Sequence, residues 1–198
     1  MSAILSPDGR FRYELRRTYR PRGMFAPPQR GLFVVIGLNP SRADATEDDP
    51  TIRRCRAFAE REGCATLVML NLFALRATEP ADLIAWLNRG EAPFKARKPD
   101  RDPDAPADEW LVEWTYTAEA VARVIREVRD VGGYVVAAWG ALADHRHVTQ
   151  RAANIAAMVT MPICGNLPLR CLGTTKEGHP RHPLYLRADA PLVPWSPT

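Results

Sequence analysis

The chain has 198 residues, of which 46% are hydrophobic and 25% are charged, and its formal net charge at pH 7 is +4. This length and composition fit one globular domain over residues 1–198 and exclude a disordered chain. No apolar run approaches the roughly 20 residues that cross a bilayer, and the first residues lack a secretory-signal pattern. We therefore expect a cytoplasmic protein without a membrane partner, and its mild positive charge suits contact with phosphate groups.

The N-terminal residues carry a hairpin signal. The segments Ala3–Leu5 and Phe11–Leu15 flank Ser-Pro-Asp-Gly, a turn sequence, and the second segment alternates apolar with polar residues. We therefore predict a β-hairpin followed by an irregular lead-in over residues 3–30, and an α/β core over residues 31–188.

Four short apolar runs in this core predict strands that are buried on both faces, as in a parallel sheet. They lie at Leu32–Ile36, Leu67–Leu72, Tyr134–Trp139 and Leu169–Gly173. Segments with helical spacing of apolar residues separate these runs. The first predicted helix starts at Pro50, with Asp49 as its cap. Three further predicted helices cover Pro80–Arg89, Asp108–Val131 and Ala141–Val159. The segment 91–107 is rich in proline and charge and predicts an exposed loop.

Strands that alternate with helices predict an α/β fold. We expect three α/β/α layers around a four-stranded, mainly parallel sheet, with the N-terminal β-hairpin added. In such folds ligands bind beyond the carboxyl ends of the strands. Three polar segments follow strands in this way: Gly37–Ser41 (GLNPS), Asn71–Phe73 (NLF) and Gly178–Pro183 (GHPRHP). We therefore expect these segments to frame one functional site.

Two asparagines occupy the first two segments. Pro40 restricts the backbone after Asn39, which would present its carboxamide at the edge of the sheet, although an ordinary Asn-Pro turn explains the pattern as well. Asn71 ends an apolar run, where an unpaired amide costs free energy. Its carboxamide either bonds to the next loop or recognises the edge of a flat ligand such as a nucleobase.

Two histidines, His179 and His182, flank Pro180 and Arg181 in the last segment. Imidazole donates or shuttles a proton near neutral pH, and prolines hold a loop rigid, as a positioned donor requires. The alternative is that both histidines are merely exposed. Rigid histidine loops at strand ends are uncommon by chance, and we therefore favour a functional role.

Two metal hypotheses are weaker. The candidate zinc ligands are Cys164, Cys171, His179 and His182, which have the right chemistry but lack the tightly spaced pair of most zinc sites. The acidic candidates for a hard cation are Asp44, Glu47, Asp48 and Asp49, whose spacing matches no common cation loop. Helix capping explains the last of these, and four reduced thiols explain the cysteines. We expect no metal and no cofactor.

The motifs resemble those of a bacterial family, the domain of unknown function 1643 (DUF1643), from about Ala3 to Leu186. The residues that carry the resemblance are FRYELRR, LNPSRADATEDDPTIRRC, NLFALRAT, AWG and GTTKEGHPRHPLYL. Membership implies no settled activity.

The order of four short motifs is also similar to the uracil-DNA glycosylase superfamily. GLNP, MLNL, AWG and GHPRHP stand where that superfamily has Gly-x-(Asp/Asn)-Pro, a strand ending in Asn, Trp-Gly and His-Pro. The resemblance implies a uracil-DNA glycosylase-like fold. It implies that Asn39 orients a water molecule, that Asn71 reads an extruded base, and that His179 stabilises charge on the departing base.

The resulting hypothesis is a nucleobase-recognising protein that acts on an N-glycosidic bond in DNA or a nucleotide. Its catalytic candidates are Asn39 and His179, and its substrate-binding candidates are Gly37, Pro40, Ser41, Asn71, Phe73, Arg181 and His182. The alternatives are a non-catalytic binder of nucleic acid or nucleotide, and a hydrolase or transferase of another small molecule on the same scaffold. Catalysis itself and the oligomeric state stay open at this point.

Overall fold

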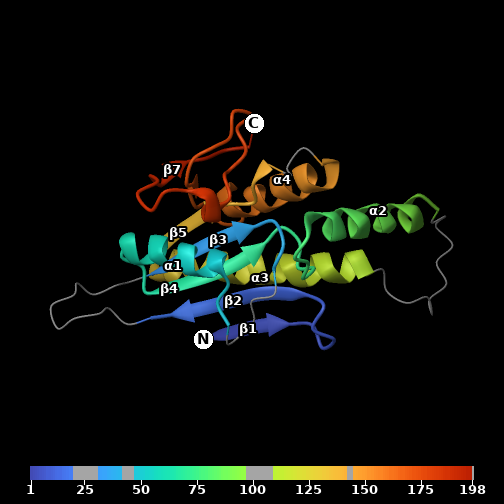
Figure 1. The fold of residues 1–198 in the computed structure, drawn as a ribbon, viewed down its shortest axis with the longest axis horizontal. Coiled ribbons are helices and arrows are strands. Elements are labelled where there is room, and N and C mark those ends of the chain that lie inside the picture. Colours follow the sequence, from blue (N-terminus) through green and yellow to red (C-terminus); the bar gives the residue numbers. More distant parts are fainter. Residues whose placement is uncertain (20–30, 42–46, 97–108, 142–144, 198) are drawn as a thin grey trace.

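A computed structural model describes residues 1–19, 31–41, 47–96, 109–141 and 145–197. Within these residues, seven strands form one sheet in the order β1-β2-β4-β3-β5-β6-β7 (Figure 1). The strands are β1 (Ser2–Leu5), β2 (Arg12–Thr18), β3 (Leu32–Gly37), β4 (Thr66–Asn71), β5 (Gly133–Ala137), β6 (Leu169–Cys171) and β7 (Val193–Pro194). The helices are α1 (Pro50–Arg61), α2 (Pro80–Ala96), α3 (Glu109–Val131) and α4 (Arg146–Thr160), with a short 3₁₀ helix η2 (Pro183–Tyr185).

The sheet is mixed. Strands β4, β3, β5 and β6 pair in parallel, whereas β1 with β2, β2 with β4 and β6 with β7 pair antiparallel. The α/β class is therefore confirmed, but the predicted sheet of four strands is too small. The N-terminal hairpin joins the sheet because β2 pairs with β4, with Leu15 opposite Met69. At the other edge, β7 has only two residues, which is too short to produce a recognisable periodicity.

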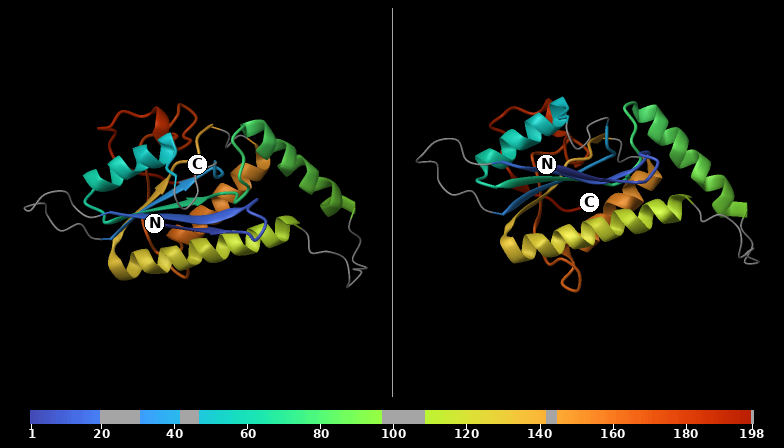
Figure 2. Two further views of the ribbon diagram at one scale, coloured as in Figure 1. Left: turned by 60° about the horizontal axis from the view of Figure 1, so that its bottom comes forward. Right: turned by 90° about the horizontal axis from the view of Figure 1, so that it is seen from below.

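Side chains of the central strands alternate between two cores, because successive residues of a strand point to opposite faces. Phe33 and Val35 pack in one core with the buried face of α1. Val34 and Ile36 pack in the other core with α2, α3 and α4. Figure 2 shows α1 and α3 on opposite sides of the sheet. Burial on both faces explains the continuous apolar runs of these strands.

Several predicted boundaries change. Asp49 caps α1 as predicted, since its side chain accepts a hydrogen bond from the Ile52 N–H at 2.8 Å. Helix α2 continues through Gly90 to Ala96, so the segment predicted as a loop begins as helix, and its residues from 97 onward lie outside the described part of the chain. A glycine inside a helix costs only about 1 kcal/mol, which a helix of this length tolerates.

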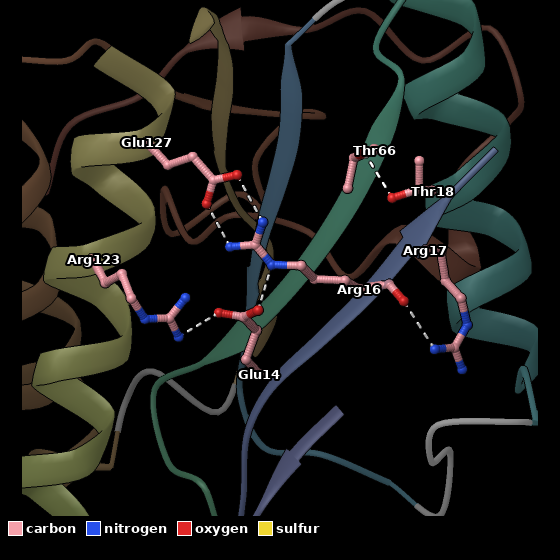
Figure 3. Close-up of polar contacts among 7 residues, drawn as sticks. All are labelled: Glu14, Arg16, Arg17, Thr18, Thr66, Arg123 and Glu127. Atoms are coloured by element: carbon pink, nitrogen blue, oxygen red, sulfur yellow. Dashed lines mark hydrogen bonds and ion pairs between the residues drawn. The ribbon is translucent and has the colours of Figure 1, made fainter. Parts of the chain in front are cut away.

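Buried and half-buried charges join β2 to α3. The Arg16 guanidinium donates to both Glu127 oxygens at 2.7 and 2.6 Å and also to Glu14, and Arg123 donates to Glu14 at 2.7 Å (Figure 3). The hydrogen bonds to Glu127 raise the pKa of Arg16, and the same contacts lower the pKa of Glu127. Glu14 and Arg16 of FRYELRR thus hold the hairpin against α3.

None of the helices in the described ranges combines the length and the apolar character that a bilayer-crossing segment requires.

Candidate functional site

The connections after the parallel strands diverge at the carboxyl end of β3. The chain leaves β3 toward α1 on one face, whereas it leaves β4 and β5 toward the helices on the other face. In open α/β sheets, ligands bind where neighbouring connections diverge in this way. The GLNPS segment lies at this point.

The first two predicted segments lie side by side. The Leu72 N–H donates to the Gly37 carbonyl at 2.9 Å, and the Phe73 N–H donates to the Leu38 carbonyl at 3.0 Å. The buried Pro40 continues this pairing, since its carbonyl accepts from the Ala77 N–H at 3.0 Å.

The side chain of Asn39 is held by this pairing. Its Nδ2 donates to the carbonyl of Ala77 at 2.8 Å and, at 3.4 Å, to that of Leu75. It also lies 3.2 Å from the Pro40 carbonyl. The amide nitrogen therefore stabilises the turn, which is the structural alternative that the sequence left open, and any contact with a ligand or water falls to the carbonyl oxygen Oδ1.

Asn71 ends β4 with only 5% of its surface exposed. Its Nδ2 is buried and has no hydrogen-bond partner among the residues that the structure describes. Gly37 lies directly beside it, because a Cβ at that position would approach Asn71 Oδ1 to 2.9 Å. A buried donor without a partner costs about 1–3 kcal/mol, so this amide marks a place where a ligand acceptor would be stabilised.

An unforeseen ion pair lies under the segment that follows Asn71. Arg151 of α4 donates through Nη1 to Glu113 of α3 at 3.0 Å and to the Leu72 carbonyl at 3.1 Å. Glu113 in turn accepts from the Ala74 N–H at 2.7 Å and from the Thr117 hydroxyl at 2.9 Å. The pair therefore joins two helices to the main chain of residues 72–74.

Aromatic rings enclose this ion pair. The Arg151 guanidinium carbon lies 4.7 Å from the ring centre of Phe73 and 4.4 Å from that of Trp114. Burial lowers the pKa of Arg151, and Glu113 opposes this shift. Phe73 is fully buried and also packs edge-on against Trp86, so its ring belongs to the core and offers no surface to a ligand.

The histidine loop is braced against the end of β5. The Pro180 carbonyl accepts from the Gly140 N–H at 2.9 Å, and the Gly178 carbonyl accepts from the Trp195 indole at 3.0 Å. The half-buried His179 bonds through its main chain to Thr175, whose N–H donates to the His179 carbonyl at 2.8 Å. The predicted rigidity of this loop thus comes from hydrogen bonds as well as from its prolines.

Asp49 acts on both the first predicted segment and the second histidine. The Ser41 hydroxyl donates to Asp49 at the start of α1. Burial lowers the pKa of His182, and the negative charge of Asp49 opposes this shift. His182 Nδ1 accepts from the Leu184 N–H at 3.4 Å, so the ring proton belongs on Nε2. Arg181, by contrast, is exposed.

Neither set of candidate metal ligands forms a cluster within the described residues. Within the described residues, no three His, Cys, Asp or Glu side chains gather as metal ligands would, and this includes the proposed zinc set. Of the acidic candidates, Asp44 lies outside the described residues, while Asp48 pairs with Arg17 at 2.6 Å.

The roles of Glu113 and Arg151 and the hydrogen bond from Ser41 to Asp49 were missed at the sequence level. A signal existed for the first two, because each interrupts the apolar face of its helix. Glu113 shares a face with the buried Thr117 and Val121, and Arg151 shares one with Val148 and Ile155. A charged residue at such a position is buried, and a buried charge is paired.

Fold and site together define an α/β protein with a polar edge beyond its parallel strands, where the buried amide nitrogen of Asn71 is left without a partner among the described residues. The chain belongs to the family described as Protein of unknown function (DUF1643), whose family model matches residues 12–184. No curated protein and no solved structure matched the chain. These comparisons do not support the resemblance to uracil-DNA glycosylases, which rests on the short motifs of the sequence.

Proposed function

We propose that this protein recognises a nucleobase, either free or in a nucleotide or DNA, at the carboxyl ends of β3 and β4. The observation that carries the proposal is the buried Nδ2 of Asn71, which has no hydrogen-bond partner in the described ranges. A carboxamide both donates and accepts, and therefore matches a base edge on which a carbonyl lies beside an N–H. Gly37 supports the proposal, because a side chain at this position would crowd Asn71 Oδ1 and displace the amide.

The proposed reaction is cleavage of the N-glycosidic bond, with Asn39 and His179 as the catalytic residues. The main-chain contacts of the Asn39 amide nitrogen fix its orientation, so that Oδ1 can accept a hydrogen bond from an attacking water. His179 lies in a braced loop, as a donor to the departing base requires. Such a donor favours the transition state because bond cleavage leaves negative charge on the base.

The test is base release and base binding by purified protein. The substrates are single- and double-stranded oligonucleotides that contain uracil or hypoxanthine. The ligands for binding also include free nucleotides and free uracil. We expect Asn71→Ala to abolish binding, whereas Asn154→Ala, which removes an exposed asparagine of α4, leaves it unchanged. Binding without base release would favour the non-catalytic alternative. Failure of every base and nucleotide to bind folded wild-type protein would contradict the proposal.

One observation favours a second candidate, a hydrolase of another small molecule. The Ser41 hydroxyl donates to a carboxylate, Asp49, whose negative charge opposes the lowering of the His182 pKa. A hydroxyl beside a base is the arrangement of an activated nucleophile. Acylation of Ser41 by an activated ester, detected by mass spectrometry and absent in Ser41→Ala, would support this candidate over base recognition.

A further inference from the structure

We propose that Glu113 and Arg151 are positioning residues for Asn71: they clamp the main chain of residues 72–74 and so fix the direction in which the Asn71 amide points. The inference rests on the proposed function for its ligand. Its structural part concerns Asn71 alone and can be tested without any ligand.

The first argument is where the ion pair attaches. Arg151 binds the Leu72 carbonyl, and Glu113 binds the Ala74 N–H, so both charges contact main-chain atoms within the three residues that follow Asn71. On its other side, the Leu72 N–H donates to Gly37. The peptide groups that follow Asn71 are therefore held from the helix layer and from β3 together.

The second argument is that stability alone does not require this pair. Glu113 and Arg151 are 1% and 7% exposed. Removing two charges from water costs free energy that their attraction often fails to offset, and well-packed apolar residues can replace buried pairs without loss of stability. A buried pair whose hydrogen bonds end on the backbone beside an amide nitrogen without a described partner is suited to hold a defined geometry.

The third argument is the restricted position of the guanidinium. The rings of Phe73 and Trp114 lie on it at 4.7 and 4.4 Å, so its plane has little freedom. Arginine stacks on aromatic rings and donates in a fixed plane, whereas lysine provides a flexible point charge. This also gives the fully buried Phe73 a role in the site, through the arginine instead of through the ligand.

The experiment compares two conservative variants on one helix. Glu113→Gln keeps the shape of the side chain but removes the charge that Arg151 faces. Glu127→Gln makes the same change about four turns further along α3, roughly 21 Å away, where Glu127 pairs with Arg16. The readouts are the side-chain amide NMR signals of Asn71, identified by their absence in Asn71→Ala, and the affinity for uracil.

We expect the Asn71 amide signals to shift or broaden in Glu113→Gln and to stay unchanged in Glu127→Gln. Uracil affinity should fall about tenfold in Glu113→Gln, which corresponds to the loss of one hydrogen bond. Unchanged Asn71 signals in folded Glu113→Gln would overturn the inference, because a purely structural pair would alter stability and leave the amide in place.

A milder variant keeps the test decisive if Glu113→Gln does not fold. Thr117→Val removes only the hydroxyl that donates to Glu113 at 2.9 Å, and it should move the same Asn71 signals by a smaller amount. Failure of wild-type protein to bind uracil would count against the proposed function only, since the amide signals still test the inference without a ligand. If wild-type protein binds uracil and both folded variants bind it as tightly as wild type, the inference is overturned and the proposed function stands.

Discussion

Two carboxylate–guanidinium networks join α3 to the sheet, and they differ in what they hold. The Glu14–Arg16–Arg123–Glu127 network holds the N-terminal hairpin, and all its ion pairs connect side chains, several of which keep contact with solvent (Figure 3). The Glu113–Arg151 pair is almost fully buried and ends on main-chain atoms beside Asn71. The same chemistry therefore secures an edge of the sheet in one region and the backbone of the candidate site in the other.

We expect the largest loss of stability from Arg151→Met, which removes one partner of the buried pair. The substitution leaves Glu113 buried without its counter-charge, and we expect unfolding to require about 3–5 kcal/mol less free energy. Urea unfolding followed by circular dichroism measures the change. Adding Glu113→Gln to Arg151→Met should recover part of the loss, and a double variant that is as unstable as the sum of both single variants would argue against direct coupling of the pair.

Gly37→Ala tests the candidate site itself, next to Asn71. The new methyl group would approach Asn71 Oδ1 to 2.9 Å, and the buried amide would have to turn away. We expect a loss of stability of about 1–3 kcal/mol, as for other overpacked positions, together with loss of uracil binding. Thermal unfolding and calorimetric titration measure the two effects. Full uracil affinity in this variant would mean that Asn71 is not in contact with the base.

Arg16→Met should have a smaller effect, although it removes three hydrogen bonds. Its partners Glu14 and Glu127 keep access to Arg123 or to solvent, so neither charge is left in an apolar environment. We expect a loss of about 1 kcal/mol in urea unfolding, near the upper end for exposed pairs, and no change in uracil affinity. A cost equal to that of Arg151→Met would remove the contrast between the two networks.

The smallest predicted effect is a pH dependence of stability from His182. Burial holds its pKa in the folded protein below the ordinary value, so the unfolded chain takes up a proton first as the pH falls. The contribution of His182 is thus fully present above about pH 6.5 and is lost as the pH falls through the folded-state pKa. His182→Gln should flatten the stability curve in this window, although not completely, because burial also lowers the pKa of His147. An unchanged curve would contradict the prediction.

Much of the fold was accessible from local patterns. The runs Leu32–Ile36 and Leu67–Leu72 predicted β3 and β4 within one residue, and Asp49-Pro50 predicted the start of α1. These signals are local, because burial on both faces demands continuous apolar residues and a helix start demands a capping group. The sheet was underestimated because the pairing of β2 with β4 joins residues far apart in the chain.

The candidate site was likewise only partly predictable from the sequence. Asn39 and Asn71 stand out in the sequence because a polar residue at the end of an apolar strand requires an explanation, and His179 stands out because prolines flank the histidines of its loop. Which atoms of these residues are engaged is a tertiary property. The sequence alone determined which strands carry polar ends. Only the tertiary structure decided that the main chain holds the Asn39 nitrogen and that the Asn71 nitrogen is left without a described partner. It also decided that Glu113 and Arg151, which are distant in sequence, clamp the backbone of residues 72–74. The reason is that hydrogen bonds depend on where folding brings donors and acceptors together.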